Sequence, residues 1–150
     1  MGFATPSLKS RALRLLARRE HSRGELQAKL APHVQDGEDL AALLDELQAK
    51  DFINEERVAE SVLHRRAPRL GTQRVLQELR RKGLAEDLVR AAAGPLKASE
   101  LERARAVWRQ RFGAEPATRE ERARQMRFLA ARGFGADIVR RVLQCGEDDE

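Results

Sequence analysis

The sequence has few of the residues that stabilise secreted or membrane proteins. It contains one cysteine, Cys145, beside an acidic tail at residues 147–150, no tyrosine and one tryptophan in 150 residues. One cysteine excludes an internal disulfide and fits a reducing compartment, so we expect a cytoplasmic protein. No segment approaches the roughly 18 apolar residues of a membrane span, and the first residues lack a signal-peptide pattern. We therefore expect no membrane partner.

Motifs of catalysis and of cofactor binding are also missing. The three histidines, His21, His33 and His64, lie apart and lack the cysteine or carboxylate pattern of a zinc site. There is no phosphate-binding loop, no dinucleotide-binding glycine motif and no nucleophile elbow. Paired acids fall at the starts of predicted helices, where they favour the helix dipole. The sequence predicts a protein that is not an enzyme and binds no metal or cofactor.

Basic residues are abundant, and their placement is uneven. The chain has 29 Lys and Arg against 24 Asp and Glu, a net charge of +5. Residues 36–60 hold nine acidic and two basic side chains, whereas residues 61–82 hold seven basic and one acidic. This asymmetry indicates that one face binds a polyanion or an acidic protein surface.

Helix formers dominate the chain, and strand signals are almost absent. We predict nine short helices, at residues 8–20, 23–32, 37–50, 55–67, 72–82, 85–93, 98–111, 119–131 and 135–144. Capping-box spacings, in which Ser or Thr precedes Glu by three residues, begin at Ser22, Ser99 and Thr118. Glycines that follow the periodic runs, and are predicted to be left-handed helix ends, are Gly83, Gly94, Gly113 and Gly133.

A helix-turn-helix joint recurs along the chain. The run LRRKGL at residues 79–84 matches LAARGF at residues 129–134, and each is followed by Asp and two aliphatic residues at the same spacing. Such self-similarity is typical of repeat proteins. We predict an all-α fold of three tandem three-helix repeats, at residues 9–53, 54–97 and 98–145, that form an elongated, curved rod.

Outward-facing basic residues recur on the predicted helices. In segment 72–82 the helical period places Val75 and Leu79 on the apolar side, while Arg74, Gln77 and Arg81 point away from it. One such row is typical of a solvated face, but recurrence on a tandem scaffold favours a binding surface, because guanidinium groups bind carboxylates and phosphates alike. The candidate partner-binding residues are Arg11, Arg14, Arg18, Arg57, Arg65, Arg66, Arg69, Arg74, Gln77, Arg80, Arg81, Lys82, Arg124 and Arg127.

The aromatic residues lie at apolar helical positions and not among the arginines. Core packing is expected for Phe52, Trp108, Phe112, Phe128 and Phe134. A channel for single-stranded nucleic acid uses exposed aromatic side chains among basic residues, and this interleaving is weak here. Weak, non-specific contact with DNA phosphates stays possible without it.

Three stretches of the chain resemble the RecX family of recombination regulators. Residues 52–84, FINEERVAESVLHRRAPRLGTQRVLQELRRKGL, resemble the family's central signature, residues 11–30 its first repeat and residues 127–134 its third. The resemblance extends from about residue 9 to residue 144. Asp51 stands where the family usually has Gly, Val58 where it often has an aromatic residue, and Thr72 where Pro is common.

The resemblance implies three tandem three-helix repeats and control of RecA. It implies a monomer that lies in the groove of the RecA filament on DNA, bridges neighbouring protomers, limits filament growth and damps ATP hydrolysis and strand exchange in recombination, repair and the SOS response. One alternative is a helix-turn-helix protein that binds DNA directly, with Gln73, Arg74 and Gln77 reaching base edges from segment 72–82. A nuclease, which metal-dependent cleavage would reveal, is a third.

Overall fold

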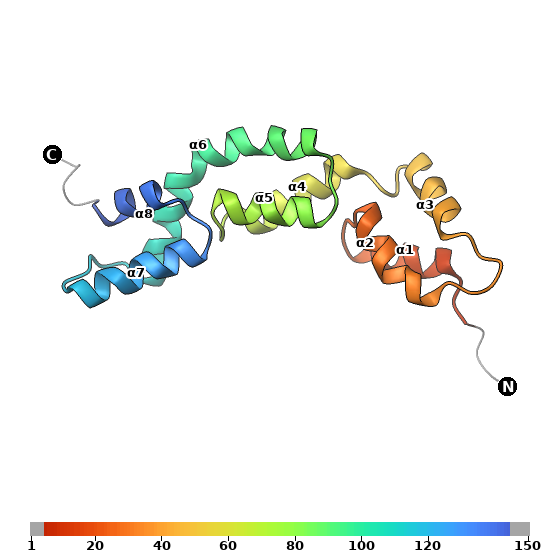
Figure 1. Ribbon diagram of the computed structural model, residues 1–150, viewed down its shortest axis with the longest axis horizontal. Coiled ribbons are helices and arrows are strands. Elements are labelled where there is room, and N and C mark those ends of the chain that lie inside the picture. The colour runs from red at the N-terminus through yellow and green to blue at the C-terminus, as the bar shows by residue number, and fades with distance from the viewer. Residues whose placement is uncertain (1–4, 145–150) are drawn as a thin grey trace.

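The computed structural model describes residues 5–144, and every regular element in that range is helical. The elements are α1 (Leu8–Arg18), α2 (Arg23–Leu30), the short 3-10 helix η1 (Ala31–His33), α3 (Leu40–Ala49), α4 (Glu55–Arg66), α5 (Thr72–Arg81), α6 (Glu86–Arg111), α7 (Arg119–Ala131) and α8 (Ala136–Leu143). Figure 1 shows them as an elongated, arched chain of helices with the two termini at opposite ends. The predicted all-α repeat rod is confirmed, whereas Cys145 and residues 147–150 lie outside the described range.

Each of three successive groups of helices surrounds its own hydrophobic core. The first bundle comprises α1, α2 and α3, the second α4, α5 and the N-terminal half of α6, and the third the C-terminal half of α6 with α7 and α8. Fully buried residues of the first core include Leu26, Leu44 and Leu47. The third core includes Leu129 and Val142. Boundaries between the repeats at 53/54 and 97/98 stay a prediction.

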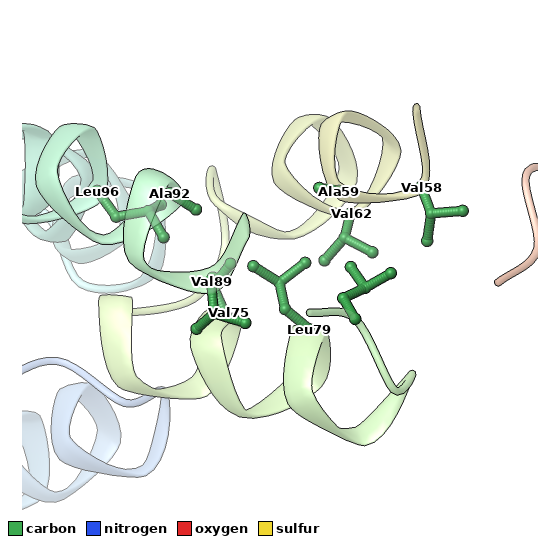
Figure 2. Close-up of a cluster of buried hydrophobic side chains, with 9 residues drawn as sticks. Val58, Ala59, Val62, Val75, Leu79, Val89, Ala92 and Leu96 are labelled. Carbon is green, nitrogen blue, oxygen red and sulfur yellow. The ribbon is translucent and has the colours of Figure 1, made fainter. Parts of the chain in front are cut away.

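The second core lies between α4, α5 and α6. Figure 2 shows Val58 and Val62 of α4, Val75 and Leu79 of α5 and Val89 of α6 around one apolar interior. The predicted apolar side of segment 72–82 is therefore confirmed for Val75 and Leu79, both of which are inaccessible to solvent.

The described residues contain eight α-helices, so the prediction of nine is wrong. Segments 85–93 and 98–111 join into the single helix α6, and Pro95 and Gly94 lie inside it. Gly94 is not among the residues with positive φ, so the predicted helix end there is also wrong. Burial of Leu96 against the second core and Ala104 against the third stabilises the helical path on both sides of the proline. Tertiary packing therefore overrides a local breaking signal.

Helix ends follow the sequence signals in most other places. Ser22 and Glu25 form the complete predicted capping box, and Thr118 accepts a hydrogen bond from the Glu121 amide. Ser99 lies inside α6, so its predicted capping role is wrong. Left-handed glycines are confirmed at Gly83, Gly113 and Gly133, with φ of 79°, 68° and 91°.

Of the predicted core aromatics, Phe112 is half-buried against Phe128 and is not part of the third core, and Phe52 lies outside the cores altogether. It follows directly after the turn at Asp51 and is 45% exposed. Its neighbour Ile53 is 3% exposed and packs into the first core instead.

Candidate partner-binding surface

The bundles meet through the ends of their second helices. At the first junction, the Ser22 hydroxyl at the start of α2 donates a hydrogen bond of 2.7 Å to the carbonyl oxygen of Lys82 at the end of α5. Gly24, in the first turn of α2, faces the same carbonyl, which would lie 3.3 Å from a Cβ at that position. The N-terminus of α2, the second helix of the first bundle, therefore packs against the C-terminal end of α5, the second helix of the second bundle.

The second junction repeats this arrangement with closer backbones. The Gly71 amide before α5 donates to the carbonyl oxygen of Arg132 after α7 at 2.7 Å, and Arg74 Nη1 donates to the Ala131 carbonyl oxygen at 2.7 Å. A Cβ on Gly71 would overlap the backbone of Gly133. Glycine is therefore required at position 71 by proximity, because its own φ of −73° suits any residue.

This head-to-tail order places opposite partial charges together. The N-terminus of α2 faces the C-terminus of α5, and the N-terminus of α5 faces the C-terminus of α7. Free amide groups carry a partial positive charge and free carbonyl groups a partial negative charge, so each contact is favourable. The junctions thus fix the three bundles in one row, visible as the succession of α2, α5 and α7 (Figure 1).

A half-buried charge cluster reinforces the first junction. Glu25 Oε2 lies 2.8 Å from Arg19 Nη2 and 3.0 Å from Lys82 Nζ, and the Glu25 and Lys82 side chains are 13% and 12% exposed. Burial alone would raise the pKa of Glu25, but hydrogen bonds from Arg19, the Ser22 amide and Lys82 outweigh it and lower the pKa to about 2. Glu25 therefore stays ionised and connects the first and second bundles.

Arg103 of α6 also joins the second and third bundles. Its guanidinium group donates to the carbonyl oxygens of Ala67 at 2.8 Å and Leu96 at 2.8 Å. Burial lowers the pKa of Arg103, and the nearby carboxylate of Glu100 opposes that change. Glu100 Oε1 in turn accepts the Thr72 amide at 3.2 Å. The start of α5 is therefore held by both α6 and the third bundle.

Five of the predicted partner-binding residues are already engaged within the molecule. Arg57 pairs with Glu20 at 3.0 Å and Asp51 at 2.8 Å, and Arg74 holds the second junction. The remaining pairs are Arg66 with Glu78, Arg80 with Glu86 and Lys82 with Glu25. The contacts of Arg74 and Lys82 hold the junctions, whereas the exposed pairs of Arg66 and Arg80 contribute little to stability. All five side chains are less available to a partner than the remaining candidates.

The other nine candidates remain available. Within residues 5–144 they form no ion pair or side-chain hydrogen bond, and only Arg11 is half-buried while the others are exposed. They are Arg11, Arg14, Arg18, Arg65, Arg69, Gln77, Arg81, Arg124 and Arg127. They come from α1, α4 with the loop after it, α5 and α7, so all three bundles contribute to this set. We call these nine residues the free cationic set, although Gln77 is neutral.

A second basic group was not predicted from the sequence. Arg111 and Arg132 lie 5.5 Å and 4.9 Å from the centre of the Phe128 ring, and both line a groove that Arg69 also borders. The repeat offers a signal for one of them, because Arg132 precedes Gly133 as Lys82 precedes Gly83. Arg111 is brought to Phe128 by the packing of α6 on α7, which local sequence does not reveal.

Among residues 5–144, no group of three His, Cys, Asp or Glu side chains could hold a metal ion. No helix in that range is sufficiently long and apolar to cross a membrane.

Comparison with known proteins identifies the family. Family models for the first, second and third three-helix domains of RecX match residues 9–47, 54–92 and 98–143. The chain belongs to the RecX family. It is 52% identical to Regulatory protein RecX of Leptothrix cholodnii over 143 residues, which cover 95% of this chain and 91% of that protein. It is 51% identical to Regulatory protein RecX of Ralstonia nicotianae over 138 residues, which cover 92% and 87%.

Solved RecX structures have the same fold. The crystal structure of RecX from Lactobacillus salivarius superposes with a TM-score of 0.69 at 20% identity and covers 91% of this chain and 92% of that one. A second crystal structure of regulatory protein RecX gives a TM-score of 0.72 at 20% identity and covers 90% and 70%. The elongated three-bundle arrangement is thus shared at low sequence identity.

Asp51 stands where the family resemblance leads us to expect Gly. Its φ is 64°, the left-handed region that glycine adopts without strain. Two neighbours hold it there, because Asn54 Nδ2 donates to Asp51 Oδ1 at 2.9 Å and Arg57 Nη1 to Oδ2 at 2.8 Å. The same contacts, led by the bond from Asn54, lower the pKa of Asp51. Hydrogen bonds from Asn54 and Arg57 therefore stabilise the left-handed conformation of Asp51.

Proposed function

We propose that the protein regulates RecA without catalysing a reaction, by binding in the groove of the RecA filament on DNA in the cytoplasm. There it limits filament extension, ATP hydrolysis and strand exchange. The observation that carries the proposal is the match of all three RecX domains along one chain. Support also comes from the shape, because an arched row of bundles can follow a helical groove over several protomers (Figure 1).

The free cationic set is the proposed contact surface for acidic side chains of RecA or for DNA phosphates. These residues belong to every bundle and are not engaged within the described chain. Arginine binds carboxylates and phosphates in the same two-pronged geometry. The protein acts as a monomer in this proposal, with the three bundles supplying three points of contact.

Direct reading of DNA by α5 is disfavoured by the second junction. A recognition helix presents its N-terminal residues to base edges. Here the Gly71 amide bonds to Arg132, the Arg74 guanidinium bonds to Ala131, and the third bundle covers the start of the helix. Binding to duplex DNA without RecA, with a sequence preference that persists at raised salt, would restore that alternative.

ATP hydrolysis by RecA on single-stranded DNA tests the proposal. We expect the protein to lower the steady rate at ratios well below one molecule per RecA protomer. Reversing Arg65, Arg69 and Arg81 to Glu should weaken this effect with an unchanged circular dichroism spectrum. Reversal of Arg90, Lys97 and Arg119, which are exposed and outside the candidate set, makes the same charge change and serves as control. No change in ATP hydrolysis at any ratio up to equimolar would reject the proposal.

A further inference from the structure

An apolar groove of about 430 Å³ lies between α4 and α6 in the second bundle. One wall is formed by Ala59 and Leu63 of α4 with Ala67, which caps that helix, and the α6 wall by Leu88, Ala91, Ala92, Pro95 and Leu96. Figure 2 shows Ala59 on α4 and Ala92 and Leu96 on α6, with the α5 side chains Val75 and Leu79 below them. The core residues therefore form the floor of a surface that is open to solvent.

Small side chains keep this groove open. Ala59 of α4 and its C-cap residue Ala67 line one side of the groove, and Ala91 and Ala92 of α6 line the other. Alanine on both sides leaves α4 and α6 in contact with α5 but without side chains that fill the space between them. Exposed apolar surface of this kind marks an interaction site more often than a random surface does.

The rim of the groove carries negative charge. Glu56 and Glu60 are exposed, lie one turn apart on α4 and border the groove. Neither carboxylate forms an ion pair or a hydrogen bond within the described chain. Most other exposed charged side chains from α4 to the end of α5 are arginines, so this rim is a local acidic site on a basic bundle.

We propose that this groove docks a segment of RecA that carries a large apolar side chain and, within about one helical turn of it, a lysine or arginine. The inference rests on the proposed function and names the chemistry of one contact. The apolar side chain enters between α4 and α6, and the cation pairs with Glu56 and Glu60. Apolar anchors in such grooves supply most of the energy of many protein interfaces.

The charge and polarity of the groove favour a protein segment over DNA or a small molecule. Two carboxylates at the rim repel the phosphates of DNA. A small molecule would need convergent polar groups, and the only hydroxyl in the groove, that of Ser99, already bonds to the Leu96 carbonyl and to Arg103. The basic and acidic surfaces then have separate partners: the free cationic set binds carboxylates or phosphates, and the groove binds a basic, apolar protein segment.

Photo-cross-linking on the filament tests the groove directly. The full-length protein carries benzoylphenylalanine at Ala91 in the groove or, as control, at Ala28, which is exposed on α2. Each is incubated with RecA filaments on single-stranded DNA, sedimented, irradiated and analysed by mass spectrometry. We expect position 91 alone to yield an adduct with a RecA peptide that holds an apolar side chain beside Lys or Arg.

Other outcomes separate failure of this inference from failure of the proposed function. If the protein sediments with the filament but position 91 yields no more RecA adduct than position 28, or reacts with DNA or with a second copy of the chain, the groove assignment is wrong and filament binding stands. If the unsubstituted protein does not sediment with RecA filaments at all, the proposed function fails, and the groove assignment with it.

Charge reversal provides an independent measurement. The double substitution Glu56→Lys and Glu60→Lys should weaken binding to the filament at least about tenfold. The control pair, Glu115→Lys and Glu120→Lys, makes the same charge change at two exposed carboxylates of the third bundle and should change binding less than about twofold. Helical content of both variants is checked by circular dichroism. Equal affinities for the two variants would overturn the proposed pairing.

Discussion

Substituting Gly71 by alanine should force the second and third bundles apart, because the second junction has no room for a methyl group. A Cβ at this position would lie more than about 1 Å inside ordinary contact with the carbonyl group of Gly133 and the amide nitrogen of Phe134. All of these atoms belong to the backbone, so rotation of a side chain cannot relieve the overlap. The third bundle must move as a whole or the start of α5 must distort.

The magnitude follows from the contacts at the junction. Overpacking of a tight contact costs roughly 1–3 kcal/mol. Separation that relieves it lengthens the two hydrogen bonds from Gly71 to Arg132 and from Arg74 to Ala131, both 2.7 Å, and each such bond contributes about 1 kcal/mol. The two costs overlap, because movement that lengthens the bonds relieves part of the overlap, so we expect the free energy of unfolding to fall by about 2–4 kcal/mol, less than their sum.

Urea denaturation followed by two probes measures this effect. Trp108, the only tryptophan of the sequence, reports on the third bundle, and helical circular dichroism reports on all three. With a slope of about 2 kcal/mol per molar urea, the midpoint should fall by about 1–2 M. We also expect the fluorescence and dichroism transitions to separate in the variant, because the junction no longer couples the bundles.

Gly94→Ala is the control, since Gly94 lies inside α6 and no other part of the molecule comes within 4 Å of a Cβ at that position. Alanine there should change the free energy of unfolding by less than about 1 kcal/mol, because its gain over glycine is opposed by the ring of Pro95 that follows it. A Gly71→Ala variant with an unchanged midpoint and coincident transitions would refute the inference that this contact couples the bundles.

Three further substitutions test other contacts. Glu25→Gln should lower the free energy of unfolding by about 2–3 kcal/mol at pH 7. The pKa of Glu25 is lowered from 4.5 to about 2. The difference in free energy of unfolding between the variant and the original protein, measured by urea titration, should therefore persist above pH 4.5 and shrink as the pH falls towards 2. A difference that does not change with pH would contradict this. Asp51→Gly should be more stable than Asp51→Ala by about 1–2 kcal/mol in thermal unfolding, since glycine adopts the positive φ without strain and alanine does not. Equal melting temperatures of the two variants would exclude backbone strain at this position. Arg57→Glu should lower the melting temperature by several degrees through repulsion of Glu20, whereas Arg81→Glu should leave it unchanged and weaken only filament binding; the reverse pattern would contradict the division into engaged and free residues.

Local patterns in the sequence were sufficient to predict most of the fold. Helical periodicity located the core side of α5, and the Lys-Gly and Arg-Gly pairs located the turns at Gly83 and Gly133, because these features depend on residues within one or two turns. The continuity of α6 was missed for the opposite reason. Gly94 and Pro95 are strong local breakers, and only burial of Leu96 and Ala104 in two different cores overrides them.

The candidate surface was less predictable, because the partners of an arginine depend on the tertiary structure. Helical periodicity alone predicts that Arg57 points to solvent. In the structure it pairs with Glu20, 37 residues earlier, at the boundary of the first two bundles. Arg74 likewise points away from its own core but reaches Ala131, 57 residues later. Sequence reasoning identifies outward cations, and only the packing of bundles distinguishes those that hold the fold from those that remain free.

A density map of RecA filaments assembled on single-stranded DNA with this protein would show whether and where it binds the filament. We predict an elongated, three-bundle density in the helical groove, in contact with neighbouring RecA protomers, with residues of the free cationic set at the interface. Density confined to the DNA or filaments that carry no added density at saturating protein would contradict this prediction.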